Sequence, residues 1–278
     1  MLCYSGAPMS VPPQTEVDLR IPGLRDSLRI HVHGEQDLHV SRRLREEGIW
    51  EPYETALLLS LLGPGQVFVD VGANIGYFSL IAASLVGDAG AVYAFEPDPG
   101  TFRLLQASVA ANGLGHRVHA VAAALAAEEG EGMLYLSADN LGDHQIHPAD
   151  ASRPSLPIRL LQGSRYLRRR LQRIDVLKVD TQGAEFEVMR GLLPLLRALP
   201  DCPRILIELT PLSLRHCGAS GRALVELLAT LEQPMWIVDH IDHRLVLHDA
   251  EALARWCDNV DAADGDAGFM NILVGPAP

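Results

Sequence analysis

The chain has little positive charge, little cysteine and no long apolar run. Its 278 residues include 23 Lys and Arg against 35 Asp and Glu, a formal net charge of −12. General nucleic-acid binding depends on neutralising phosphates with Lys and Arg, so this balance argues against a nucleic-acid partner. The four cysteines lack C-x-x-C spacing and indicate neither a zinc site nor a disulfide framework.

Membrane and secretion signals are missing as well. No stretch reaches the roughly 18 consecutive apolar residues that cross a bilayer. Residues 1–14 have neither a basic start nor an apolar core, so we expect no secretory signal, a cytoplasmic location and no membrane partner. The hydrophobic content of 48% is enough for one large α/β core.

The most informative segment is residues 67–78, VFVDVGANIGYF. An apolar strand runs here into a glycine-punctuated turn that opens a helix. Glycines let the backbone approach a ligand closely, and a helix N-terminus presents free N–H groups. A second apolar run ends in Glu96 about 20 residues later, where nucleotide-binding folds place the carboxylate that holds a ribose. Together the two pieces predict a cofactor that contains a nucleoside.

The residues of the turn distinguish between the candidate cofactors. A dinucleotide fold expects G-x-G-x-x-G beneath a pyrophosphate, whereas Asn74 stands at the second glycine. Asp70 at the end of the strand suits a cationic amino-acid moiety better than a diphosphate, because a carboxylate repels phosphates. The sequence therefore disfavours NAD.

Strand and helix patterns alternate along the chain. Predicted strands cover residues 67–71, 91–95, 118–122, 176–179, 205–209, 235–238 and 271–274, with an extra antiparallel piece at 133–136. Predicted helices cover residues 50–62, follow Gly76 and Asp98, start at Ala184 and lie near 220–232. This alternation predicts a doubly wound α/β fold, whose mostly parallel sheet is covered on both faces. Residues 137–173 are the least regular part.

Four carboxylates follow four of these strands, namely Asp70, Glu96, Asp180 and Glu208. Ligands in such sheets bind outside the carboxyl ends of the strands, so we expect these groups to share a site. Neighbouring carboxylates repel one another unless a cation or several donors lie between them, and a positively charged cofactor would supply that cation. The alternative is that some of them, Glu208 above all, cap the following helices.

Three strings resemble the FkbM family of S-adenosylmethionine-dependent methyltransferases: VFVDVGANIGYFSL, AFEPDPGTFRLLQASVAANGL and IDVLKVDTQGAEFEVMRGL. The resemblance covers about residues 50–274. It implies the class I methyltransferase fold, with a seven-stranded sheet and a reversed last strand. It also implies S-adenosylmethionine as the methyl donor and, usually, O-methylation of a small molecule or sugar. The methyltransferase domain would span residues 49–278, with residues 1–48 as an N-terminal extension or lid.

The resemblance also implies roles for single residues. The implied cofactor-binding residues lie around the turns after the first two strands: Asp70, Gly72, Asn74, Gly76, Tyr77, Glu96 and Pro97. Of these, Glu96 would hold the ribose hydroxyls. Asp180 would also contact the cofactor, beside the transferred methyl. The family often has Glu where this chain has Gln182, so we assign Gln182 no catalytic charge.

Transfer to a hydroxyl needs a group that accepts its proton. A histidine can accept a proton near neutral pH, and our leading hypothesis makes His144 in the irregular segment the general base, with Asp180 next to the methyl. His216 is a second candidate. The alternative for His144 is a loop histidine bonded to nearby backbone. The carboxylates and histidines of the same segment match no strong metal motif, so no metal site is predicted.

One basic run, residues 165–173, stands out in this acidic chain. Such a run is usually a solvated helix face, and its functional alternative is contact with an anionic or carrier-bound acceptor. Three functions remain open. A small-molecule O-methyltransferase leads, followed by a methyltransferase acting on nitrogen or a peptide, and by a catalytically silent nucleotide-binding module.

Overall fold

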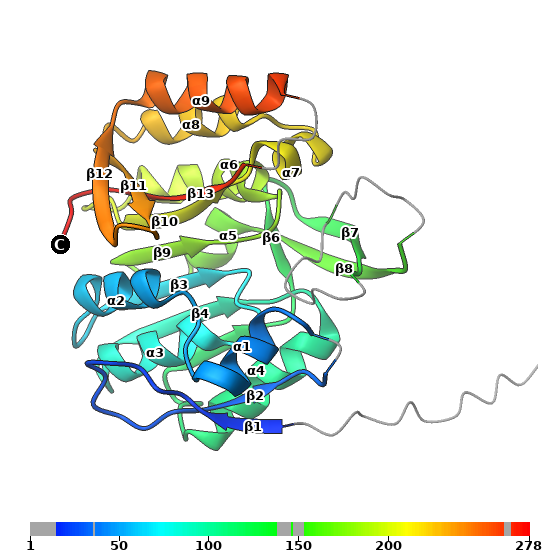
Figure 1. The fold of residues 1–278 in the computed structure, drawn as a ribbon, viewed down its shortest axis with the longest axis vertical. Helices are drawn as coiled ribbons and strands as arrows, with labels where there is room; N and C mark the ends of the chain where they lie inside the picture. The colour runs from blue at the N-terminus through cyan, green and yellow to red at the C-terminus, as the bar shows by residue number, and fades with distance from the viewer. Residues whose placement is uncertain (1–14, 36, 138–145, 147–152, 264–267) are drawn as a thin grey trace, which may run out of the picture.

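The computed structural model describes residues 15–35, 37–137, 146, 153–263 and 268–278. Its centre is an eight-stranded sheet in the order β12-β11-β13-β10-β9-β3-β4-β5 (Figure 1). The strands are β3 (Val67–Val71), β4 (Ala91–Phe95), β5 (Val118–Val121), β9 (Val176–Val179), β10 (Arg204–Leu209), β11 (Met235–Asp239), β12 (Arg244–His248) and β13 (Met270–Val274). β3, β4, β5, β9 and β10 pair in parallel, whereas β13 is antiparallel to both of its neighbours.

The predicted sheet is confirmed, including its reversed last strand. Each of the seven predicted strands lies within about one residue of an observed one, because continuous apolar runs mark strands that are buried on both faces. β12 adds an eighth strand at the edge, paired with β11 through a hairpin. The sequence analysis did not anticipate this strand.

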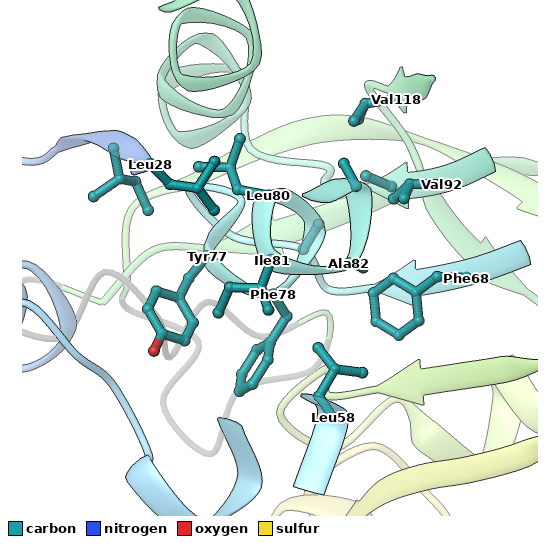
Figure 2. Close-up of a cluster of buried hydrophobic side chains, with 14 of the residues drawn as sticks. Leu28, Leu58, Phe68, Tyr77, Phe78, Leu80, Ile81, Ala82, Val92 and Val118 are labelled. Carbon is teal, nitrogen blue, oxygen red and sulfur yellow. The ribbon is translucent and has the colours of Figure 1, made fainter. Parts of the chain in front are cut away.

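Helices cover both faces of the sheet. One face carries α2 (Pro52–Leu61), α3 (Tyr77–Val86) and α4 (Pro99–Ala111). The other carries α6 (Glu185–Leu196), α7 (Pro211–His216), α8 (Gly221–Ala229) and α9 (Ala250–Ala262). Figure 2 shows α3 lying on the sheet, and Leu80, Ile81, Phe68 and Val92 belong to the same buried cluster. Among the described residues, no helix is long and apolar enough to cross a bilayer.

The predicted start of α4 is confirmed. Asp98 accepts a hydrogen bond from the backbone N–H of Thr101 at 2.7 Å, and Pro99 occupies the first turn. The carboxylate satisfies an N–H that has no partner within the helix, and the fixed φ of proline suits the first helical position. The turn after β4 is therefore rigidly defined.

The N-terminal segment packs on α4. β1 (Thr15–Asp18) and β2 (Arg29–Val32) form an antiparallel pair, and α1 (Val40–Glu47) follows. The backbone N–H of His31 donates to Ser108 Oγ at 2.9 Å, while Ile30 and Val32 are fully buried. The sequence analysis placed no elements here. The division of the chain at residue 48 stays a prediction.

A second, three-stranded sheet follows β5. It consists of β6 (Ala124–Ala126), β7 (Gly130–Tyr135) and β8 (Ser155–Gln162), and α5 (Gly163–Leu167) comes next. The predicted antiparallel piece at 133–136 is β7. The interpretation of 137–173 as irregular is wrong for residues 155–167. β8 contains Pro157, although proline disfavours strands. The strand tolerates this proline because β6 pairs only with Leu160–Gln162, so that β7 is the single neighbour of β8 at Pro157.

Candidate active site

A cavity of about 430 Å³ lies at the carboxyl ends of the central strands. Its walls include all residues predicted to bind the cofactor except Gly76: Asp70, Gly72, Asn74, Tyr77, Glu96, Pro97 and Asp180. Glu208 lines the same cavity, so the four strand-end carboxylates share one site as expected. The topology of the sheet brings them together, because parallel strands end at the same edge.

The turn after β3 needs glycine for packing reasons. Gly72 has φ of 82°, and a Cβ at this position would overlap the carbonyl oxygen of Asp180. Gly76 has φ of 94°, and a Cβ there would overlap the side chain of Leu105 on α4. Gly76 is therefore required by the contact between two helices, and it does not line the cavity.

Asn74 replaces glycine in this turn without steric difficulty. Its φ of 52° lies in the left-handed region, which asparagine tolerates better than most residues. Its Oδ1 accepts a hydrogen bond from the N–H of Ile75 at 2.8 Å. This local bond holds the turn that carries the cavity wall.

Glu96 joins the turns that follow β3 and β4. Its two carboxylate oxygens accept backbone N–H bonds, from Asn74 at 2.9 Å and from Asp98 at 2.8 Å. Each oxygen keeps a second lone pair, so the group can still accept bonds from a ligand's hydroxyls. Burial raises the pKa of Glu96 to about 8, although both N–H bonds favour the charged form.

One cation among the carboxylates is a residue of the chain, in addition to any charge that a bound cofactor would supply. Lys178 Nζ, in the middle of β9, lies 2.8 Å from Asp180 Oδ2 and 3.7 Å from Glu54 Oε1. Burial alone would lower the pKa of Lys178, but these two carboxylates raise it well above its usual value. The sequence analysis missed this role. A lone lysine within the buried run VLKV is the signal that could have revealed it.

Asp70 lies beside Lys178 in the β3–β9 pairing. Its Oδ2 accepts a bond from Ser79 Oγ of α3 at 2.6 Å, and only 1% of the residue is exposed. Burial raises the pKa of Asp70 to about 6, while Lys178 opposes the shift. One carboxylate oxygen is thus committed to α3.

Gln182 bridges two of the carboxylates. Its Nε2 donates to Asp180 Oδ1 at 2.8 Å and to Glu208 Oε2 at 3.0 Å. Burial raises the pKa of Glu208 well above its usual value, whereas Lys178 overcomes burial and lowers the pKa of Asp180. Ala184 and Thr210 begin α6 and α7, and the bonds of Asp180 and Glu208 named here go to Lys178 and Gln182, so the capping alternative for these two carboxylates gains no support.

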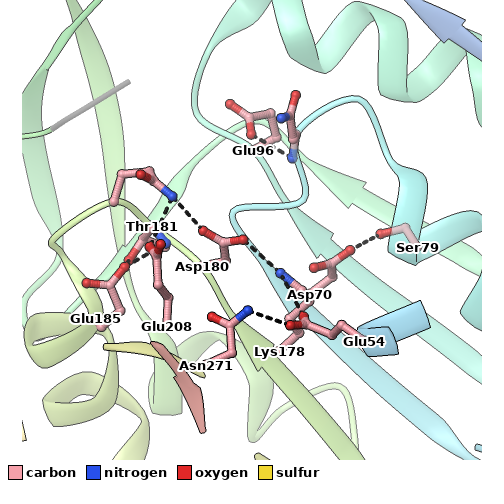
Figure 3. Close-up of polar contacts among 12 residues, drawn as sticks. Glu54, Asp70, Ser79, Glu96, Lys178, Asp180, Thr181, Glu185, Glu208 and Asn271 are labelled. Carbon is pink, nitrogen blue, oxygen red and sulfur yellow. Dashed lines mark hydrogen bonds and ion pairs between the residues drawn. The ribbon is translucent and has the colours of Figure 1, made fainter. Parts of the chain in front are cut away.

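Two further wall residues come from distant parts of the chain. Asn271 of β13 lines the cavity, and its Nδ2 donates to Glu54 Oε2 at 2.6 Å (Figure 3). Glu54 of α2 is 2% exposed. Glu51, which begins α2, also lines the cavity. The sequence analysis assigned none of these residues to the site.

The two histidines predicted as candidate general bases, His144 and His216, both lack support as bases among the described residues. His144 lies outside the described residues, so its catalytic role stays a prediction. His216 ends α7 and is not among the residues that line the cavity, which leaves its role without support there. In the described part of the chain, no group of three or more His, Cys, Asp or Glu residues could hold a metal ion.

The basic run makes contacts away from the cavity. Arg165 pairs with Glu129 at 2.9 Å, and Arg173 pairs with Asp175. The guanidinium of Arg170 lies 3.8 Å from the centre of the Tyr166 ring. Contact between this run and an anionic acceptor stays a prediction.

The sheet order, the reversed strand and the acidic cavity at the strand ends define an α/β protein with the class I methyltransferase fold. Its sequence matches the family described as Methyltransferase FkbM domain over residues 70–248, and the chain belongs to this family.

A curated relative is Hexuronic acid methyltransferase AglP from Haloferax volcanii, 29% identical over 177 residues. The match covers 62% of this chain and 65% of the relative, so the chain spans slightly less than two thirds of that protein.

Among solved structures, a SAM-dependent O-methyltransferase from Thermotoga maritima is 12% identical, with a TM-score of 0.43, covering 91% of this chain and 75% of that one. Fibrillarin from Aeropyrum pernix, solved with S-adenosyl-L-methionine bound, is 14% identical, with a TM-score of 0.41, covering 81% and 76%. At this distance neither structure assigns an activity to the chain.

Proposed function

We propose that the protein is an S-adenosylmethionine-dependent methyltransferase that methylates a hydroxyl of a small molecule. One observation carries the proposal: in a chain of the FkbM family, the Gly72–Asn74 turn, Glu96 and Asp180 surround a single cavity. Hydroxylated small molecules such as sugars or polyketides are the proposed acceptors. We further propose a cytoplasmic location and no nucleic-acid partner, in line with the net charge of −12.

The chemistry of the walls suits this donor. Glu96 offers free lone pairs to ribose hydroxyls, and the acidic groups at the other strand ends suit a cationic ligand. When bound, the donor would supply an activated methyl group. The task of the chain is then to hold the methyl and the acceptor oxygen in line and to exclude water. Asp180, at the end of β9, would border the transferred methyl.

The cavity walls favour a neutral hydroxyl over an anionic acceptor at this position. Asp70, Glu96, Asp180 and Glu208 all line the cavity, and Lys178 is already bonded to Asp180. Lys178 lowers the pKa of Asp180, and a carboxylate brought beside the ionised Asp180 would be repelled. The Haloferax relative is nevertheless named a hexuronic acid methyltransferase, so hexuronic acids should be tested as acceptors alongside neutral hydroxylated compounds.

Two measurements test the proposal. Calorimetry should show binding of S-adenosylhomocysteine, the demethylated donor, and no binding of NAD. Mass spectrometry of reactions with a methyl-labelled donor should show label on a neutral sugar, polyketide or hydroxylated amino-acid derivative. Binding of NAD without binding of S-adenosylhomocysteine would contradict the proposed methyl donor. Binding of S-adenosylhomocysteine without transfer to any acceptor would favour the silent module, and label on a peptide or an amine would favour the other methyltransferase class.

The catalytic roles of His144 and Asp180 can be tested with the same reaction. His144→Ala and Asp180→Asn should both slow single-turnover transfer to the labelled acceptor, by about 100-fold or more for loss of a general base. If both variants keep the wild-type rate, His144 is not the general base and Asp180 does not act beside the transferred methyl.

A further inference from the structure

Glu51 enters the cavity from a constrained turn. It is the residue before α2, and its φ of 41° and ψ of 69° lie in the left-handed region that few L-residues adopt. The N–H of Thr55 donates to the Glu51 carbonyl at 2.8 Å, and Thr55 Oγ1 donates to the Trp50 carbonyl at 2.7 Å. A strained residue held by its surroundings in this way often marks a functional position.

Glu51 has a buried carboxylate oxygen without a partner. In the described part of the chain, four buried side-chain atoms lack a hydrogen-bond partner: His31 Nδ1, Glu51 Oε2, Thr210 Oγ1 and Asp261 Oδ1. Of these four residues only Glu51 lines the cavity. Asp70, Glu96, Asp180 and Glu208 each accept a hydrogen bond from another residue, and the side chain of Trp50 also bonds the Glu51 carboxyl but leaves Oε2 without a partner. A buried acceptor without a donor is costly, so a ligand in the cavity is the expected source of that donor.

Glu51 and Glu96 lie on different sides of β3, because Glu51 is next to Lys178 and Asp180 at the end of β9, Glu96 follows β4, and β9 and β4 flank β3. Glu51 interacts with Glu54, Lys178 and Asp180, whereas Glu96 interacts with Asp98 and Asp70. Lys178 does not meet the need of Glu51, because its Nζ is bonded to Asp180 and paired with Glu54. Burial and the neighbouring Glu54 raise the pKa of Glu51 to about 8.

We propose that Glu51 Oε2 binds the α-ammonium group at the amino-acid end of the methyl donor. The inference rests on the proposed function, which places the ribose at Glu96. A donor that lies with its ribose at Glu96 and extends past β3 towards β9 brings its amino-acid end to the side of the cavity where Glu51 has a buried oxygen without a partner. The ammonium supplies both the missing hydrogen-bond donor and the positive charge that an ionised Glu51 requires.

The test compares two ligands by calorimetry on the full chain. Glu51→Gln should weaken binding of S-adenosylhomocysteine by about tenfold to hundredfold, as expected for loss of a hydrogen bond between charged groups. Binding of 5′-methylthioadenosine, which lacks the amino-acid end, should not change. Glu47→Gln is the matched control, because Glu47 is exposed on α1 and pairs with Arg43 on the same helix. This variant should bind both ligands as the wild type does.

Proton release provides a second readout. An adjacent ammonium favours the ionised form of Glu51, so binding of S-adenosylhomocysteine at about pH 7 should release a proton from it. Titrations in buffers of different ionisation enthalpy measure this release, which should fall by about one proton per site in Glu51→Gln. The charged and titratable neighbours that also act on the carboxyl, Glu54, Tyr77, Lys178, Asp180 and Glu208, are unchanged in the variant.

The wild-type protein alone gives an independent check if Glu51→Gln does not fold, as judged by its melting curve. The desamino analogue of S-adenosylhomocysteine should bind the wild type as weakly as the variant binds the parent ligand. Where the variant folds, the two losses should not add, because both remove the same contact. Equal affinity of the wild type for both ligands, or unchanged affinity in Glu51→Gln, would overturn the proposal. Failure of the wild type to bind S-adenosylhomocysteine at all would instead contradict the proposed function.

Discussion

Gly72 and Asp180 lie so close together that a methyl group at position 72 would overlap the carbonyl oxygen of Asp180. The N–H of Asp180 donates to the carbonyl of Val71 at 3.0 Å, so the ends of β3 and β9 are joined by backbone at this point. The ends of β3 and β9 can approach each other this closely, beside the cavity, because Gly72 has no side chain. This contact gives the first prediction.

Gly72→Ala should lower the free energy of unfolding by about 2–5 kcal/mol, the sum of a left-handed alanine and an overpacked contact. Gly113→Ala is the matched control, because Gly113 also has a positive φ, of 66°, but no atom within 4 Å of an added Cβ. It should lose only the backbone part, about 1–2 kcal/mol. Urea unfolding measures both. Equal losses would mean that the Gly72 contact relaxes without cost.

Lys178→Met should destabilise the protein by about 3–5 kcal/mol, because it leaves buried carboxylates without their cation. The side chains of Lys178 and Glu54 are only 5% and 2% exposed, so solvent cannot replace the ammonium. The double variant Lys178→Met/Glu54→Gln should lose less than the sum of the two single variants. Denaturant unfolding of all four proteins gives the coupling free energy, and strict additivity would contradict the ion pair.

Glu96 should make stability fall as the pH rises. Its pKa is about 8 in the folded state against 4.5 for an ordinary glutamate, so between these values the folded state binds the extra proton. Stability is then greatest at low pH and is lost as the pH approaches 8. Glu96→Gln should flatten the plot of unfolding free energy against pH by up to ~1.4 kcal/mol per pH unit. An unchanged slope would contradict a protonated Glu96.

Gln182→Glu should destabilise the protein by about 1–3 kcal/mol at pH ~8. The substitution replaces an amide that donates to Asp180 and Glu208 with a third carboxylate. At pH ~5 the loss should be smaller, since a protonated carboxyl can still donate one hydrogen bond. Gln182→Met removes the donors without adding charge, so its loss should depend less on pH. Parallel pH profiles of the two variants would show that charge at this position is unimportant.

Local patterns were sufficient to predict most of the main sheet and the wall of carboxylates. Val67–Val71 and Ala91–Phe95 are continuous apolar runs, and Asp98 with Pro99 is a helix start that needs no tertiary information. The convergence of the strand-end carboxylates followed from the parallel order of the strands. These features depend on neighbours within a few residues, or on one rule of topology.

The partners of the carboxylates could not be predicted in this way. Glu54 and Asn271 are bonded although they are 217 residues apart, and no spacing in the sequence connects them. The free oxygen of Glu51 is recognisable only when its surroundings are known. β8 contains Pro157, a residue type that disfavours strands, and only the three-dimensional arrangement shows that the strand has one neighbour at this position.

The place of β13 in the sheet has a consequence for the order of assembly during synthesis. This strand lies between β10 and β11, both of which leave the ribosome before it. Until Met270–Val274 has emerged, β10 and β11 each lack one of their two neighbouring strands, and Glu54 has no Asn271 to bind. A nascent or truncated chain that ends before β13 therefore exposes an apolar strand edge, which makes it prone to aggregation, and its cavity lacks the wall that Asn271 supplies.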